Sequence, residues 1–124
     1  MRLAFVIPVF NERETLEPLA AGIARHASPH EYQILFVDDG SADGSYDVLR
    51  SLHERDPRVG LLKLRRNYGK TRALAAGIAC AEGDVLITMD ADLQDDPEEI
   101  PRLLAKLDEG YDVVCGWKAD RHDP

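Results

Sequence analysis

The fold is best indicated by the stretch Val85-Leu86-Ile87-Thr88-Met89-Asp90-Ala91-Asp92-Leu93-Gln94, in which an apolar run leads into two carboxylates one residue apart. If the run is a buried strand, side-chain alternation puts Asp90 and Asp92 on the same side, about 6.6 Å apart at a rise of ~3.3 Å per residue. Two like charges at that distance are costly unless a cation accompanies them. Oxygen ligands of this kind suit Mg²⁺ or Mn²⁺, which commonly accompany a phosphate-bearing ligand. The stretch therefore predicts a strand that ends at the binding site of an enzyme.

Outward from this stretch, short β-rich runs alternate with segments of helical spacing. Most of the runs are nearly continuous in apolar residues, as in parallel strands that are covered on both faces. Helical spacing links Leu16 to Ile23, Tyr46 to Leu52, Leu74 to Ala81 and Ile100 to Leu107. Five strands and four crossover helices imply an α/β fold, with a single domain over residues 1–124 and a three-layer α/β/α, mainly parallel, Rossmann-like sheet. The expected strands are Leu3–Val9, Tyr32–Val37, Val59–Leu64, Val85–Met89 and Val113–Trp117.

Several predicted helices carry end signals. Asn11-Glu12-Arg13-Glu14 resembles a capping box for the first helix, and Asp43 is expected to cap the second. Asp96-Pro97-Glu98-Glu99 supplies an N-cap, a proline and first-turn acids for the last helix, which Gly110 is expected to end.

The composition limits the classes of partner and the location that can be expected for the chain. A net charge of −8 over 124 residues argues against a nucleic-acid partner, which needs a dense basic surface. Cys80 and Cys115 lack metal-ligand spacing and are expected to be reduced and buried. The longest uncharged apolar stretch, Ala73–Ala81, is far shorter than the ~20 residues of a membrane span, and no secretory signal is visible. We therefore expect a cytoplasmic location for this chain.

The carboxyl ends of parallel strands meet at one edge of a sheet, and that edge is where ligands bind. Asp38-Asp39-Gly40-Ser41 follows the second expected strand. The segment could be a simple turn, because Asp and Gly favour turns. Alternatively, its acids could accept hydrogen bonds from a ribose hydroxyl or a base N–H.

A basic cluster follows the third expected strand. It places five of the fifteen basic residues within ten positions, namely Lys63, Arg65, Arg66, Lys70 and Arg72. One interpretation is a solvated helix start; the other is a phosphate-holding or anion-steering group, because the helix dipole does not favour cations there. Gly69-Lys70-Thr71 is not a P-loop, because Leu64 stands where that motif needs glycine. The loop after the first strand has no glycine, which excludes a dinucleotide-binding fingerprint.

Four segments together resemble the family 2 inverting glycosyltransferases. They are Val6-Ile7-Pro8-Val9-Phe10-Asn11-Glu12, Val37-Asp38-Asp39-Gly40-Ser41, Asn67-Tyr68-Gly69-Lys70 and Met89-Asp90-Ala91-Asp92-Leu93-Gln94. The ending Asp-Leu-Gln, with Val113-Val114-Cys115-Gly116-Trp117-Lys118, is most similar to the branch of dolichyl-phosphate mannose synthase and polyprenyl-phosphate glycosyltransferases. The resemblance implies a GT-A fold of the nucleotide-diphospho-sugar transferase type.

The resemblance also implies roles for individual residues. Pro8, Phe10 and Glu12 would contact the nucleotide, Val37 and Asp39 would lie around the base and ribose, and Asp90, Ala91 and Asp92 would lie at the diphosphate. Lys70 and Lys118 would complete the nucleotide-sugar site, although Lys118 stands where this branch usually has arginine. The metal, Mg²⁺ or Mn²⁺, would be held by Asp90, Asp92 and Gln94.

Family members continue well past residue 124, so the expectation is a truncated fold that lacks the acceptor-binding half and the catalytic base. The leading hypothesis is the donor domain of a metal-dependent transferase, which moves a sugar from a UDP- or GDP-sugar to a polyprenyl or dolichyl phosphate with inversion. A binding module without transfer activity is the first alternative. A phosphoryl-accepting receiver-like domain is the second, although its acid pair would follow the first strand. Apolar surface left exposed by a missing half would favour self-association.

Overall fold

The computed structural model describes residues 2–27, 30–92 and 97–108. Its strands are β1 (Arg2–Val9), β2 (Glu31–Asp38), β3 (Val59–Lys63) and β4 (Val85–Thr88). Its helices are α1 (Leu16–Ala27), α2 (Ser45–Arg55), α3 (Lys70–Cys80), the 3₁₀ turn η1 (Pro97–Glu99) and α4 (Ile100–Asp108). The four strands pair in the order β3-β2-β1-β4, and every pairing is parallel.

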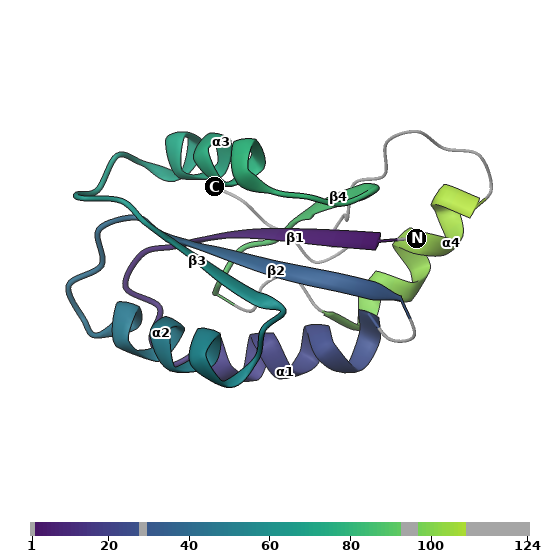
Figure 1. Cartoon of the computed structure of the whole chain (residues 1–124), viewed down its shortest axis with the longest axis horizontal. Helices are drawn as coiled ribbons and strands as arrows, with labels where there is room; N and C mark the ends of the chain where they lie inside the picture. The colour runs from purple at the N-terminus through teal and green to yellow at the C-terminus, as the bar shows by residue number, and fades with distance from the viewer. Residues whose placement is uncertain (1, 28–29, 93–96, 109–124) are drawn as a thin grey trace, which may run out of the picture.

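The helices form a layer on each face of this sheet (Figure 1). α3 lies on one face, and α1 and α2 lie on the other, with α4 against α1. This arrangement confirms the predicted three-layer α/β/α sheet for the described residues. The expected fifth strand, Val113–Trp117, and the expected helix end at Gly110 lie outside them.

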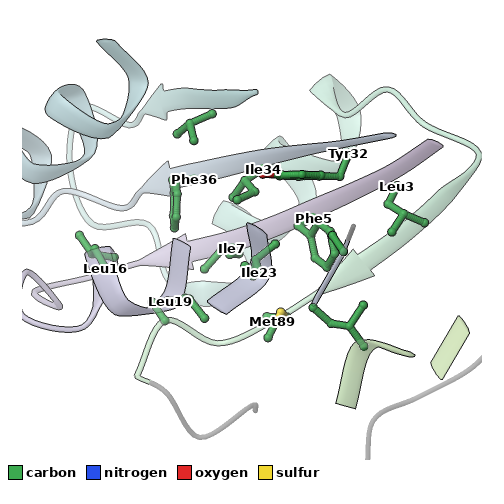
Figure 2. Close-up of a cluster of buried hydrophobic side chains, with 14 of the residues drawn as sticks. Leu3, Phe5, Ile7, Leu16, Leu19, Ile23, Tyr32, Ile34, Phe36 and Met89 are labelled. Carbon is green, nitrogen blue, oxygen red and sulfur yellow. The ribbon is translucent and has the colours of Figure 1, made fainter. Parts of the chain in front are cut away.

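The larger core fills the space between the sheet and α1 (Figure 2). Alternate side chains of the strands point into it, because the side-chain period of a strand is two residues. Full burial of one such apolar side chain contributes about 1.5–3 kcal/mol. Its main members are Leu3, Phe5, Ile7 and Val9 from β1, Tyr32, Ile34 and Phe36 from β2, and Leu16, Leu19 and Ile23 from α1.

The opposite face is packed with smaller residues. Val6 and Val37 meet Ala73 of α3 in a second buried cluster. Gly77 lets α3 approach the sheet closely, because a Cβ there would lie 2.5 Å from Val6 Cγ1 and 2.8 Å from Val37 Cγ2. α3 therefore sits directly on β1 and β2.

Three expectations about these elements are wrong. β4 was expected to reach Met89 and to be buried on both faces. It ends at Thr88, and Leu86 is 45% exposed, because β4 is the edge strand of the described sheet. The capping box at Asn11 does not form, since α1 begins at Leu16 and Asn11 has a φ of 53°. Cys80 is exposed, because α3 ends there, beyond the buried positions Ala73 and Gly77.

Two smaller expectations can also be compared with the structure. Gly44, and not Asp43, occupies the N-cap of α2, so that expectation is wrong, although Asp43 Oδ1 accepts the N–H of Ser45, the first residue of the helix, at 3.0 Å. Asp96, the expected cap of the last helix, lies outside the described residues. Within the described part of the chain, no helix has the length and apolar character needed to cross a bilayer.

Candidate functional site

Four loops meet at one edge of the sheet because all four strands point the same way. The strand registers pair Val9 with Asp38, Asp38 with Lys63, and Val6 with Thr88. The segments that follow β1, β2 and β3 therefore start side by side, and the segment after β4 starts beside Val6 of β1 and runs toward the same edge. The prediction that the unusual polar residues share one edge is confirmed for the described residues.

The loop after β1 is joined to the segment before α2 by hydrogen bonds. Asn11 N donates to Ser41 Oγ at 2.9 Å, and Ala42 N donates to Asn11 Oδ1 at 2.8 Å. Glu12 N donates to Ser45 Oγ at 2.9 Å, and the Ser45 side chain is fully buried. These bonds hold Asn11 in its left-handed conformation, which a residue other than glycine seldom adopts. We call this set the serine junction.

The serine junction also positions two residues that are predicted to contact the nucleotide. Phe10 comes just before it and is 47% exposed, so its ring is available for stacking, as predicted for a nucleotide-contacting side chain. Glu12 lies half-buried within it. Burial raises the pKa of Glu12 above its ordinary value, the negative charges of Asp92 and Asp43 raise it further, and a hydrogen bond from Thr15 lowers it. The influence of Asp92 shows that the loops after β1 and β4 lie close together.

Thr15 connects the same two loops directly. Its hydroxyl lies within hydrogen-bond distance of the backbone oxygens of Glu12 and Ala91. Ala91 is buried, and Met89 is anchored in the main core, so the turn that carries Asp90 and Asp92 is held at both sides. Thr15 is not among the predicted site residues; the available signal was a small hydroxyl residue just before the first helix.

Asp39 is buried, and its carboxylate is bonded to the loop after β3. Its Oδ1 accepts the N–H of Tyr68 at 2.8 Å. Its Oδ2 accepts the N–H of Gly69 at 3.0 Å and the side-chain amide of Asn67 at 3.1 Å. We call these three bonds the Asp39 latch. Neither the turn nor the ribose interpretation anticipated them, and a contact between Asp39 and a nucleotide stays a prediction.

Asp38 follows the turn interpretation. Its Oδ1 accepts the N–H of Ser41 at 3.2 Å, closing the turn after β2. Its Oδ2 is buried and has no hydrogen-bond partner among the residues described. Asp38 is therefore a buried structural acid rather than an exposed ligand.

The basic cluster separates into residues that point to different partners. Lys63 Nζ lies 4.2 Å from the ring centre of Tyr46, and the Arg66 guanidinium lies 5.0 Å from that of Tyr68. Lys70, in contrast, forms an ion pair with Asp90. Of the predicted phosphate-holding residues, Lys70 is thus brought to the carboxylates at the end of β4.

The two carboxylates after β4 do not project from a strand, so the alternation argument for them is wrong. β4 ends at Thr88, and Ala91 and Asp92 lie in a turn. The Asp90 side chain is 24% exposed, whereas Asp92 is an exposed residue. Both still lie at the same edge of the sheet, because the turn returns toward Glu12 and Thr15.

Pro8 and Val37 lie near the carboxyl ends of their strands, and their contacts with a nucleotide stay predictions. They are register partners on β1 and β2, and both are buried. The Val37 side chain has no exposed surface and packs with Val6 and Ala73. Any contact of Val37 with a base or ribose would therefore have to use its backbone.

The described carboxylates fit a cation, but they do not complete a metal site. Asp90 already holds the ammonium of Lys70, which is a positive charge at the predicted metal position. Among the described residues, no group of three His, Cys, Asp or Glu side chains could hold an ion. The predicted ligands Gln94 and Lys118 lie outside those residues. Remaining ligands for a metal would have to come from there or from a bound diphosphate.

A groove of about 670 Å³ lies elsewhere, between α1 and α2. It is lined by small residues such as Ala20, Ala21 and Ala24, and by Leu52 and Val59. No residue that follows a strand end lines it. Its charged lining residues are Glu17, Arg55 and Asp56, whereas the predicted site residues among those described lie at the sheet edge.

Comparison with known proteins identifies the family of the chain. Residues 4–123 match the family described as Glycosyl transferase family 2. The chain is 45% identical over 126 residues to undecaprenyl-phosphate 4-deoxy-4-formamido-L-arabinose transferase of Pseudomonas savastanoi pv. phaseolicola, a match that covers 98% of this chain and 37% of the relative. The chain thus spans little more than a third of that curated relative.

Solved structures share the fold. The mannosyltransferase PcManGT of Pyrobaculum calidifontis, in complex with GDP-Man and Mn²⁺, is 26% identical with a TM-score of 0.67, over 73% of this chain and 27% of that one. S. aureus TarS 1–349 is 22% identical with a TM-score of 0.74, over 88% of this chain and 33% of that one. On the match over nearly its whole length, the chain belongs to glycosyl transferase family 2 and has the Rossmann-like α/β fold of GT-A enzymes.

Proposed function

We propose that this chain binds a nucleotide-diphosphate sugar with Mg²⁺ or Mn²⁺, as the donor part of an inverting glycosyltransferase whose acceptor is a polyprenyl phosphate. The observation that carries the proposal is the meeting of Glu12, Lys70, Asp90 and Asp92 at one sheet edge of a family 2 chain. The name of the 45% identical relative supports an undecaprenyl-phosphate acceptor. The GDP-Man and Mn²⁺ bound to the mannosyltransferase support a metal-dependent donor site.

Different residues at this edge can contact different parts of the donor. The exposed Phe10 ring offers a stacking face to the base. Asp90 and Asp92 would hold the divalent ion, which when bound neutralises charge on the departing diphosphate. The Lys70 ammonium can contact a phosphate oxygen, since it stands beside Asp90 and is largely exposed.

Inversion requires that the acceptor oxygen attacks the anomeric carbon from the face opposite the diphosphate. A polyprenyl-phosphate oxygen is ionised at neutral pH, so this acceptor needs no strong base for its activation. No described residue is assigned as a base, and the expectation that a base lies elsewhere in a longer protein stays a prediction. The cytoplasmic location and the self-association also stay predictions.

Donor binding is tested by calorimetry with UDP-glucose and GDP-mannose, with and without Mn²⁺. We expect binding that Mn²⁺ strengthens, and Asp92→Ala should weaken the Mn²⁺-dependent part by at least about tenfold, because loss of even an outer-shell metal partner costs about 10- to 100-fold. Asp84→Ala is the matched control, since it removes an exposed acid just before β4, at its other end. Equal affinity of Asp92→Ala and wild type in Mn²⁺ would refute the metal site.

A binding module without transfer is the remaining alternative. Transfer of sugar to a short polyprenyl phosphate, measured with a radiolabelled donor, separates the two functions. The receiver-like alternative is wrong, because the chain belongs to family 2 and its acid pair follows β2 rather than β1.

A further inference from the structure

The Asp39 latch determines where α3 begins. Its three donors, Tyr68 N, Gly69 N and Asn67 Nδ2, are consecutive along the chain and end at Gly69, the residue before α3. Asn67 Nδ2 also donates to the Asp39 backbone oxygen at 3.1 Å. A carboxylate that accepts several N–H bonds holds them strongly, because charge-assisted bonds are about twice as strong as neutral ones. The start of α3 is therefore fixed to the end of β2.

Two glycines beside the latch meet special backbone requirements. Gly69 has a φ of 99° and a ψ of 153°, a conformation essentially restricted to glycine. Gly40 has a φ of 76°, and a Cβ there would lie 2.5 Å from both Arg66 C and Asn67 N. Gly40 thus lets Asp39 and the loop approach each other closely, and Gly69 supplies the backbone conformation that leads into α3.

The residue that the latch presents is Lys70. It is the first residue of α3, where the helix dipole disfavours a cation. Its ammonium pairs with Asp90, so the unfavourable position is offset by an acid from the neighbouring loop. The same carboxylate is a predicted ligand of the divalent ion.

We propose that Lys70 is the built-in counter-ion of Asp90, positioned by the Asp39 latch, and that a bound diphosphate draws Lys70 away so that the metal binds together with the nucleotide. This inference rests on the proposed donor site. An ammonium and a divalent ion compete for the same carboxylate oxygens. A diphosphate offers the ammonium other anionic oxygens and supplies ligands that the described carboxylates lack. Metal and nucleotide should therefore strengthen each other's binding by the same factor.

The experiment measures Mn²⁺ affinity by electron paramagnetic resonance, with and without UDP. Without UDP, Lys70→Ala should bind Mn²⁺ about two- to fivefold more tightly than wild type, the range expected when one exposed ion pair is removed. With UDP, the same variant should bind Mn²⁺ less tightly than wild type, so the enhancement by UDP falls. Arg50→Ala is the matched control, because it removes an exposed cation on α2, outside the basic cluster, and should change neither value.

A charge-neutral variant tests the latch itself. Gly69→Ala adds a methyl group that meets nothing within 4 Å, so it disturbs only the backbone conformation. We expect it to shift Mn²⁺ affinity in the direction of Lys70→Ala, by a smaller factor. Wild-type affinity for Mn²⁺ in Gly69→Ala would overturn the positioning role of the latch.

The counter-ion role fails if Lys70→Ala does not tighten Mn²⁺ binding without UDP, or if Arg50→Ala tightens it equally. Failure of the proposed function looks different, since wild type would then bind neither UDP nor GDP at any Mn²⁺ concentration. The comparison in Mn²⁺ alone would still decide whether Lys70 competes for Asp90.

Discussion

The serine junction and the Asp39 latch hold neighbouring parts of the same sheet edge in different ways. The serine junction distributes its bonds over several side chains, so Ser41, Ser45 and the Asn11 amide each bond to one backbone N–H of the partner loop. The Asp39 latch directs three donors to one buried carboxylate. A distributed junction can lose one bond and keep its shape, whereas a concentrated one depends on a single side chain. The difference suggests that the loop carrying Lys70 is the part of the edge most sensitive to one substitution.

The largest effect is expected from Asp39→Ala. Three donors lose their acceptor, and we expect the free energy of unfolding to fall by about 2–4 kcal/mol, since charge-assisted bonds contribute about 1.5–3 kcal/mol each and water can reach part of the opened loop. Urea denaturation followed by circular dichroism measures the change. Asp39→Asn keeps one oxygen acceptor and should lose less; an equal loss in both variants would show that charge, rather than the number of acceptors, decides.

A smaller loss is expected from Ser45→Ala in the serine junction. The buried hydroxyl accepts Glu12 N and donates to Asp43 Oδ1 at 2.6 Å, so its removal should cost about 1–2 kcal/mol in the same urea assay. Ser51→Ala is the matched control, because Ser51 is exposed on the same helix. If Ser45→Ala costs as much as Asp39→Ala, the contrast between a distributed and a concentrated junction is lost.

The smallest effect, and one of opposite sign, is expected from Glu12→Gln. Because the pKa of Glu12 is raised above its ordinary value of 4.5, its ionised form opposes folding at neutral pH. The variant should therefore be slightly more stable than wild type at pH 7. The difference should disappear as the pH falls through the raised pKa, where wild-type Glu12 takes up a proton. Thermal unfolding from pH 4 to pH 8 measures this, and a difference that does not vary with pH would contradict the assigned cause.

The described elements were largely predictable from the sequence, because apolar runs and helical spacing are local signals. β1 begins one residue earlier than predicted, and β2 is one residue longer than predicted at each end. The common edge of Glu12, Asp39, Lys70 and Asp90 followed from the parallel sheet alone. The end of β4 did not follow from the parallel sheet, because Met89 and Ala91 turn to meet the main core and Thr15.

The partners of the polar residues were not predictable, since they come from distant positions. Asn11 was expected to cap α1, but its amide bonds to Ala42, and Asp39 was expected to face a ligand, but it bonds to residues 28 to 30 positions away. The cover of α3 over the Val37 side chain was not predictable either, since Ala73 comes from a distant position. A list of acids at strand ends therefore gives the location of a site but not the assignment of each acid.

The bare backbone of Gly77 has a consequence for the geometry of donor recognition. Lys70 lies seven residues earlier on the same helix, about 10 Å along its axis. With no room for even one methyl group between α3 and the valines beneath it, the height of that axis above the strands is set at Gly77. A larger residue there would tilt or raise α3 and move the ammonium relative to Asp90. The spacing between the basic and acidic sides of the site is thus controlled from two helical turns away, by a contact that no substrate touches.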